Sequence, residues 1–173
     1  PPEKELAGKV ALITGAAGGI GSATANKFLK EGCCVILTDI DSRALQKTKE
    51  NFQNKFGSDV VKSIVMDVTN ENEVKKAVDE SINIFGGIDI LVANAGFASA
   101  APFDKTSSKL WDKNMAVLSK GCFLISREVY SQMMRQNMGG SIIFISSKNS
   151  LSASKGASAY SVAKSSLLHL SRS

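Results

Sequence analysis

The chain has 173 residues, of which 43% are hydrophobic and 21% are charged, and its formal net charge is +5. These proportions are those of an ordinary globular domain, and no segment reaches the roughly 18 consecutive apolar residues that a membrane span requires. The lysines are spread along amphipathic stretches without aromatic partners, which argues against nucleic-acid binding, and residues 1–6 lack the pattern of a secretory signal.

Short apolar runs alternate with longer amphipathic stretches along the chain. The runs predict β-strands over residues 10–14, 34–38, 60–66, 88–93 and 141–146. The stretches predict helices near residues 20–31, 42–56, 71–85, 107–138 and 157–173. Several runs are apolar on both faces, which is typical of strands inside a parallel sheet. The alternation therefore predicts an α/β fold of the Rossmann type, a doubly wound parallel sheet with helices on both faces.

A single domain accounts for residues 9–173, and the two prolines within residues 1–8 predict an extended linker that leads into it. The last predicted helix reaches Ser173 without a Gly or Pro stop and with no strand after it. We therefore expect the domain to be incomplete at its C-terminal end.

Three cysteines and one histidine give no basis for a disulfide framework or a metal site. Cys33, Cys34 and Cys122 lie in apolar stretches without Cys-x-x-Cys spacing, so we interpret them as small buried residues in a reducing compartment. His169 is interpreted as a surface or helix-packing residue. These features predict a cytoplasmic protein without a bound metal ion.

A glycine-rich turn, Thr14-Gly15-Ala16-Ala17-Gly18-Gly19-Ile20-Gly21, joins the first predicted strand to the first predicted helix. This strand–turn–helix context makes the turn a candidate for binding a dinucleotide pyrophosphate. Gly15 would permit the tight turn, Gly19 would let the helix N-terminus approach the phosphates, and Gly21 would allow close packing of the helix on the sheet. The free N–H groups of the helix end would bind phosphate oxygens. The predicted cofactor contacts here are Gly15, Gly18, Gly19, Ile20 and Gly21.

Asp39 closes the second predicted strand, 18 residues after Gly21. A carboxylate at this place accepts hydrogen bonds from both hydroxyls of an adenine ribose and repels a 2′-phosphate, which favours NAD over NADP. The alternative is that Asp39 caps the following helix, a role that Asp41 could share or take.

Tyr160 and Lys164 are four residues apart on a predicted helix, so they share one face. An ammonium beside a phenol favours the phenolate and lowers the phenol's pKa toward the range of a general base. Such pairs are common on surfaces, but Ser146 and Ser147 end the fifth predicted strand, at the edge where open α/β sheets bind ligands. No acid or histidine is placed to make a serine nucleophilic, so hydride transfer with a bound cofactor fits better.

Together these motifs resemble the short-chain dehydrogenase/reductase family, from about Lys9 to the chain end. The matching elements are Thr-Gly-x-x-x-Gly-x-Gly at Thr14–Gly21, Asp67-Val68, Asn94-Ala95-Gly96, Tyr160-x-x-x-Lys164, and Ser147 placed 13 residues before Tyr160. The resemblance implies that Asp67 and Val68 contact the adenine. It also implies that Asn94, Ala95 and Gly96 border the cofactor and support the sheet.

The same resemblance assigns the chemistry to three side chains. Tyr160 would be the general acid/base, and Lys164 would lower the pKa of Tyr160 and bind the nicotinamide ribose. Ser147 would orient and polarise the carbonyl or alcohol, with Ser146 as the alternative if the strand end is shifted by one residue.

One departure from the family pattern concerns the long fourth helix. Aligning Trp111-Asp112 and Gly121-x-Phe123 places Leu118 where the family commonly has an asparagine that anchors a water in a proton relay. Asn114 lies one turn earlier on the same face, so either Asn114 or water takes over part of this role, or the relay differs. A second departure is length, because family members continue with two more strands and a substrate-binding loop.

A narrower resemblance links residues 114–118, 146–151, 156–160 and 168–170 to the dehydrogenase domain of bifunctional rhamnulose-1-phosphate aldolase/alcohol (lactaldehyde) dehydrogenases. It implies an upstream aldolase domain joined through Pro1-Pro2, Leu118 as a normal residue of the subfamily, and a small hydroxy-aldehyde or alcohol as substrate. The wider family implies a homo-oligomer that pairs through its fourth and fifth helices.

The resulting expectation is an NAD-dependent oxidoreductase that interconverts an alcohol and a carbonyl of a small, sugar-derived or similar molecule. We expect neither a nucleic acid nor a membrane as a partner. The alternative is a non-catalytic NAD-binding domain with a regulatory or assembly role, which Leu118 and the expected C-terminal incompleteness favour. The set of Ser147, Tyr160 and Lys164 favours the enzyme.

Overall fold

The computed structural model describes residues 4–173, and at its centre lies a five-stranded sheet with the strand order β3-β2-β1-β4-β5. The strands are β1 (Val10–Thr14), β2 (Cys34–Asp39), β3 (Val61–Val65), β4 (Ile90–Ala93) and β5 (Ser141–Phe144). All pairings between them are parallel. The doubly wound parallel sheet predicted from the alternating pattern is therefore confirmed.

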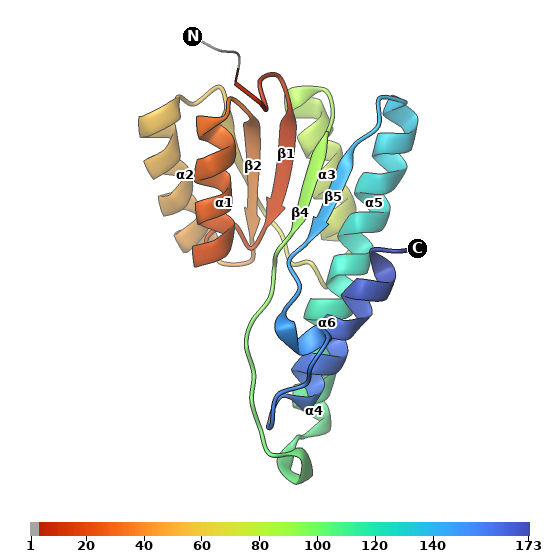
Figure 1. Ribbon diagram of the computed structural model, residues 1–173. Coiled ribbons are helices and arrows are strands. Elements are labelled where there is room, and N and C mark those ends of the chain that lie inside the picture. The colour runs from red at the N-terminus through yellow and green to blue at the C-terminus, as the bar shows by residue number, and fades with distance from the viewer. Residues whose placement is uncertain (1–3) are drawn as a thin grey trace.

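Helices cover both faces of this sheet (Figure 1). One face carries α1 (Gly19–Lys30) and α2 (Ser42–Phe56), and the other carries α3 (Glu71–Phe85), α5 (Gly121–Gln136) and α6 (Ser158–Leu170). Adjacent residues of a strand point to opposite faces, so Leu12 belongs to the core under α3 and α5, while Ala11 and Ile13 belong to the core under α1 and α2. Two apolar cores explain why the strands are hydrophobic on both sides.

The single helix predicted over residues 107–138 is divided into three segments. They are α4 (Ser108–Asn114), the π-helix η2 (Met115–Lys120) and α5. The π geometry ends where the N–H of Gly121 donates to Ala116 O, five residues back. At Gly121 the chain passes so close to the loop after β3 that a Cβ would lie 2.8 Å from Val68 Cγ2. Amphipathic periodicity does not distinguish a π-helical from an α-helical segment, so the pattern predicts one continuous helix.

Other boundaries differ by only a few residues from those expected. Strands β3, β4 and β5 are shorter than predicted, and β5 ends at Phe144, before Ser146. Short 3₁₀-helices lie at η1 (Phe103–Lys105) and η3 (Lys148–Ser150). The last helix ends at Leu170.

The beginning of the described chain folds back onto the domain. Residues 5–8 form turns, Leu6 N–H donates to Glu31 O at 3.1 Å, and the Leu6 side chain packs against the core under α1 and α2. This part of the expected linker is therefore packed instead of extended, and Pro1 and Pro2 lie outside the described residues. Over residues 4–173, no helix has both the length and the apolar character needed to cross a bilayer.

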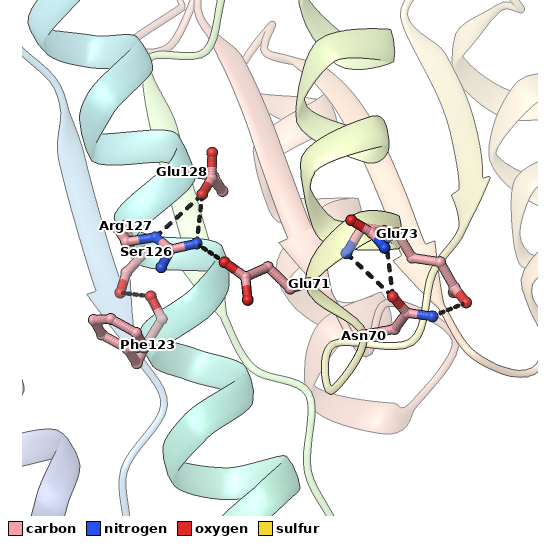
Figure 2. A network of polar contacts seen from close by, with 8 residues as sticks. Asn70, Glu71, Glu73, Phe123, Ser126, Arg127 and Glu128 are labelled. Atoms are coloured by element: carbon pink, nitrogen blue, oxygen red, sulfur yellow. Dashed lines mark hydrogen bonds and ion pairs between the residues drawn. The ribbon is translucent and has the colours of Figure 1, made fainter.

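Polar contacts fix the start of α3 and connect it to α5 (Figure 2). Asn70 caps α3 by accepting hydrogen bonds from Asn72 N and Glu73 N. Arg127 of α5 forms ion pairs with Glu71 and with its neighbour Glu128. Glu73 also accepts a hydrogen bond from Asp67 N at 2.9 Å. This network therefore positions the loop that follows β3.

Candidate active site

A large cavity lies along the carboxyl ends of the strands, where ligands of open α/β sheets bind. Its volume is about 850 Å³. It is lined by the glycine-rich turn, the end of β2, the segments after β3, β4 and β5, and residues of α2, α4, η2 and α6. The cavity thus joins most of the residues that the sequence motifs single out, with Gly21 and Ser147 outside its lining.

The glycine-rich turn leaves the start of α1 open toward this cavity. Gly15 has a φ of +64°, a conformation that L side chains rarely adopt, and its ideal Cβ would lie 2.9 Å from Ala95 Cα. Gly18 is the N-cap of α1 and offers no side-chain acceptor, and the first turn of α1 contains no acidic residue. The N–H groups at this helix end are therefore available to an anion.

The two later glycines of the turn have different surroundings. A Cβ at Gly19 would meet no atom within 4 Å, and Gly19 lines the cavity. A Cβ at Gly21 would collide with Gly15 O and would lie 2.8 Å from Asn94 Nδ2. Gly21 lies outside the cavity lining, so it acts by packing α1 against the turn and the end of β4. The space beside Gly19 fits the close approach of a phosphate group.

Asn94 connects the end of β4 to the glycine-rich turn. Its Nδ2 donates to Thr14 O at 2.9 Å and to Gly15 O at 3.1 Å. The hydroxyl of Thr14 in turn accepts from Asn94 N and Ala95 N, each at 2.9 Å. Asn94, Ala95 and Gly96 all line the cavity. They therefore support the turn and border the space for a ligand at the same time.

Carboxylates gather at the end of the cavity formed by β2 and β3. Asp39 Oδ2 accepts from Ala17 N at 3.1 Å, and its Oδ1 accepts from Asp41 N at 3.1 Å. Asp41 caps α2 by accepting from Arg43 N and Ala44 N. The helix-cap alternative for Asp39 is thus wrong, and Asp41 has that role. Asp67 and Val68 line the same end of the cavity.

Tyr160 and Lys164 lie in α6 and line the opposite end of the cavity. Lys164 is 5% exposed, and its Nζ donates to Ile145 O at 2.6 Å. Burial of the ammonium lowers the pKa of Lys164 below its ordinary value of 10.5. The amine is therefore a desolvated group held at the carboxyl end of β5.

The two candidate serines differ in their contacts. Ser146 lines the cavity, and its hydroxyl donates to Lys164 O at 3.4 Å. Ser147 is not part of the lining, and its Oγ accepts from Asn149 N at 3.2 Å as the cap of η3. Within residues 4–173 the Ser147 hydroxyl donates no hydrogen bond, so its O–H is available to a ligand oxygen.

Leu118 and Asn114 are both buried and contact other parts of the protein instead of the cavity. Leu118 is fully buried in η2, and a Cβ at Gly96 would lie 2.8 Å from Leu118 Cδ2. The buried amide of Asn114 donates from Nδ2 to Leu110 O at 2.7 Å and accepts from Ser99 Oγ at 2.9 Å. Neither residue lines the cavity. Asn114 thus ties α4 to the segment after β4.

The thiols are not suited to nucleophilic chemistry. Burial raises the pKa of Cys33 to about 12 and that of Cys122 to about 11, so both remain protonated at neutral pH. Cys34 is only half-buried, unlike the expectation for all three cysteines, and burial also raises its pKa. Within residues 4–173, no group of three or more His, Cys, Asp or Glu side chains could hold a metal ion.

Several residues of the lining were not predicted from the sequence. They are Ala17, Thr38, Ile40, Asp41, Ala44, Met66, Phe97, Ala98, Lys113, Val117 and Ile145. Most are chain neighbours of predicted residues at strand ends, so proximity in sequence was the available signal. Lys113 precedes Asn114, which the sequence singled out for a different role, and it lies one helical turn before Val117.

Comparison with known proteins places these features in a family. The sequence profile described as short chain dehydrogenase matches residues 9–173. The chain belongs to this family. The sheet and the cavity described above are therefore those of a short chain dehydrogenase domain. This domain contains the glycine-rich turn, the Asn94–Gly96 segment and the Tyr160/Lys164 pair.

Among the relatives of this short chain dehydrogenase domain is the uncharacterized oxidoreductase YuxG of Bacillus subtilis, 48% identical over 172 residues. That match covers 99% of this chain and 25% of the relative. A dehydrogenase subunit of Thauera aromatica, which acts on (2S)-[(R)-hydroxy(phenyl)methyl]succinyl-CoA, is 37% identical over 95% of this chain and 64% of its own length. The chain thus spans a quarter of the length of the Bacillus relative and about two thirds of the length of the Thauera relative.

Solved structures show the same fold. NAD+-bound xylitol dehydrogenase superposes with a TM-score of 0.92 at 34% identity, covering 96% of this chain and 64% of that protein. A short chain dehydrogenase/reductase from Burkholderia phymatum in complex with NAD gives a TM-score of 0.93 at 28% identity, covering 97% and 59%.

Proposed function

We propose that this domain is an NAD-dependent oxidoreductase that interconverts an alcohol and a carbonyl. The observation that carries the proposal is the single cavity that joins the open start of α1, the Asp39 carboxylate and the Tyr160/Lys164 pair. When bound, NAD supplies the hydride acceptor or donor. The protein's own groups hold the dinucleotide and move the proton of the substrate oxygen.

The roles follow from the chemistry of each group. Gly19 and Ile20 offer N–H donors to the diphosphate beside Gly18, whose own N–H donates to Gly15 O at 3.2 Å. Val68 offers an apolar surface to the adenine. Tyr160 exchanges a proton with the substrate oxygen, and Lys164, one helical turn later, places an amine at the same end of the cavity. The resemblance assigns the polarising hydroxyl to Ser147, whose donor is available in the structure. We retain Ser146, which lines the cavity, as the alternative.

NAD, and not NADP, is the proposed cofactor. Asp39 presents a carboxylate at the end of β2, where it would accept from ribose hydroxyls and would repel a 2′-phosphate. Among the residues that line the cavity, the cations are Lys113 and Lys164, and both lie at the other end. Two structural neighbours named as NAD complexes support the same choice.

For the substrate we propose a small hydroxy-aldehyde, polyol or similar sugar-derived molecule. The name of the xylitol dehydrogenase neighbour supports a polyhydroxylated substrate of this size. We also propose that the domain belongs to a longer protein, because 172 matched residues are only 25% of the Bacillus relative, and that an aldolase domain precedes it, as the narrower resemblance implies. The cytoplasm is the proposed location.

A homo-oligomer is part of the proposal. Phe123, Tyr130 and Met134 of α5 are 43%, 57% and 63% exposed and lie on one face of the helix, which they share with Arg127. An apolar stripe of this kind on a helix is typical of an interface between subunits. Size measurement by light scattering tests it, and a monomer at micromolar concentration would contradict it.

The test of the activity combines binding with turnover. NADH and NADPH are titrated by fluorescence, and reduction of NAD is followed with a panel of short alcohols and polyols. We expect tighter binding of NADH and turnover of at least one substrate that Tyr160→Phe abolishes. If the protein binds NADH but turns over no substrate, and if Tyr160→Phe leaves NADH binding unchanged, the result would instead support the non-catalytic alternative that Leu118 favours.

A further inference from the structure

Lys113 is a cation beside the cavity for which the proposed reaction has no role. It lies in α4 and lines the cavity together with Val117, one helical turn later. Its Nζ is 4.8 Å from the centroid of the Phe97 ring, in the segment after β4. Within residues 4–173, no carboxylate lies within ion-pair distance of this ammonium. The protein therefore holds a positive charge here without neutralising it.

The position of this charge is fixed by its surroundings. The Phe97 ring attracts the ammonium by a cation–π contact. Asn114, the next residue of α4, accepts from Ser99 Oγ at 2.9 Å and so ties α4 to the segment that carries Phe97. A side chain whose ammonium is already placed loses less conformational entropy when it binds a ligand.

The distribution of charge around the cavity gives Lys113 a specific task. Asp39, Asp41 and Asp67 line one end, and Lys113 and Lys164 line the other. Lys164 is buried and donates to Ile145 O. Lys113 is exposed and has only an aromatic ring as partner. It is therefore the cation of the described lining that can meet a charged ligand directly.

We propose that Lys113 is an anion-binding residue of this cavity and that its ligand is a phosphate or carboxylate group. The inference rests on the proposed function, because the diphosphate of the dinucleotide is one source of such a group. The other source is a substrate that itself carries a phosphate or carboxylate. In either case the ammonium forms a charge-assisted contact that neutral side chains cannot replace.

The first experiment measures binding, not turnover. NADH and ADP-ribose are titrated into the wild-type protein and into Lys113→Ala, Lys113→Arg and Lys109→Ala variants. Lys109 is an exposed lysine of the same helix that does not line the cavity, so it controls for net charge. If the diphosphate is the ligand, Lys113→Ala weakens both ligands about three- to tenfold and reduces the salt dependence of binding. Lys113→Arg and Lys109→Ala stay near wild type.

The second experiment addresses a substrate anion. Inorganic phosphate and acetate are titrated into the protein saturated with NADH. If Lys113→Ala leaves NADH binding unchanged, the proposal requires that phosphate or acetate binds the wild-type complex and that Lys113→Ala loses this binding. A Lys113→Ala variant that matches the wild type for all four probes overturns it. Failure of the wild-type protein to bind NADH would refute the proposed function instead, and phosphate and acetate binding without NADH would then decide the role of Lys113.

Discussion

Asn94 Nδ2 donates to Thr14 O at 2.9 Å and to Gly15 O at 3.1 Å, and this one amide connects β4 to the turn that follows β1. Removing a half-buried donor leaves two carbonyl oxygens without it, which costs about 1–3 kcal/mol. We expect Asn94→Ala to lower the free energy of unfolding by this amount in urea titrations. Asn94→Asp should cost at least as much, because a carboxylate has no hydrogen to offer. The exposed Asn54→Ala is the control and should change little.

The two glycines at the start of α1 should respond differently to alanine. Gly21→Ala places a Cβ against backbone atoms and Asn94 Nδ2, so we expect a loss of about 1–3 kcal/mol in stability. Gly19→Ala adds a Cβ in open space beside the cavity, so the fold should stay within about 1 kcal/mol of wild type. NADH affinity should nevertheless fall roughly tenfold, equivalent to about 1.4 kcal/mol. Unchanged NADH binding by a stable Gly19→Ala protein would argue against phosphates at this turn.

Much of this arrangement could be predicted from the sequence, because it depends on local patterns. Alternating apolar runs and amphipathic stretches determine the parallel sheet, and parallel strands bring Asp39 and Asn94 to one edge. The π-helical segment before Gly121 could not be predicted, since amphipathic periodicity does not distinguish π-helical from α-helical turns. The same holds for Lys113, whose contact with Phe97 joins two segments that no local pattern connects.

The choice between Ser146 and Ser147 also depended on local structure. Strand β5 ends at Phe144 and η3 begins at Lys148, so the serines lie in a short irregular segment whose orientation no periodic pattern describes. The structure places Ser146 in the lining but uses its hydroxyl to donate to Lys164 O, whereas the Ser147 hydroxyl keeps its donor. Lining and donor availability thus point to different residues.

Alanine variants of the two serines decide which hydroxyl polarises the substrate. We expect Ser147→Ala to lower kcat/KM by roughly 10²- to 10³-fold, as for loss of a donor to a developing oxyanion. Ser146→Ala should stay within about tenfold of wild type, because its hydroxyl already has an acceptor. Since Ser147 also caps η3, Ser147→Thr serves as the matched variant that restores both the cap and the donor. The reverse ranking in steady-state kinetics would transfer the role to Ser146.

Asp39 and Asp41 form a natural pair for testing cofactor preference. Asp39→Ala should weaken NADH binding and narrow the difference between NADH and NADPH about tenfold or more, equivalent to about 1.4 kcal/mol. Asp41→Ala removes the cap of α2 and should cost about 1 kcal/mol in stability, while the preference for NADH stays. Fluorescence titration of both variants with both cofactors measures this. If Asp39→Ala keeps the full preference, the carboxylate at the end of β2 does not recognise the ribose.

The buried ammonium of Lys164 predicts a pH dependence of stability. Burial lowers the pKa of Lys164 in the folded protein, whereas the unfolded chain keeps a value near 10.5. Between these two values the unfolded state binds more protons, so this group makes the free energy of unfolding rise with pH up to about 10.5. At pH values below the pKa of Lys164 in the folded protein, Lys164 is charged in both states, and burying this charge lowers the free energy of unfolding. Lys164→Met keeps the apolar stem and removes the charge, so it should be more stable than wild type at neutral pH.

Urea unfolding of wild type and Lys164→Met from pH 7 to pH 10 measures the effect. The stability advantage of the variant should shrink as the pH rises, and other titrating groups cancel in the difference. Lys47→Met, at an exposed site of α2, should show a difference that does not depend on pH in this way. The variant should also lose turnover, because Tyr160 then lacks the neighbouring charge. A more stable but inactive protein would mean that the active site keeps this charge at the expense of stability. A difference in stability that stays constant with pH would mean that the ammonium is hydrated in solution.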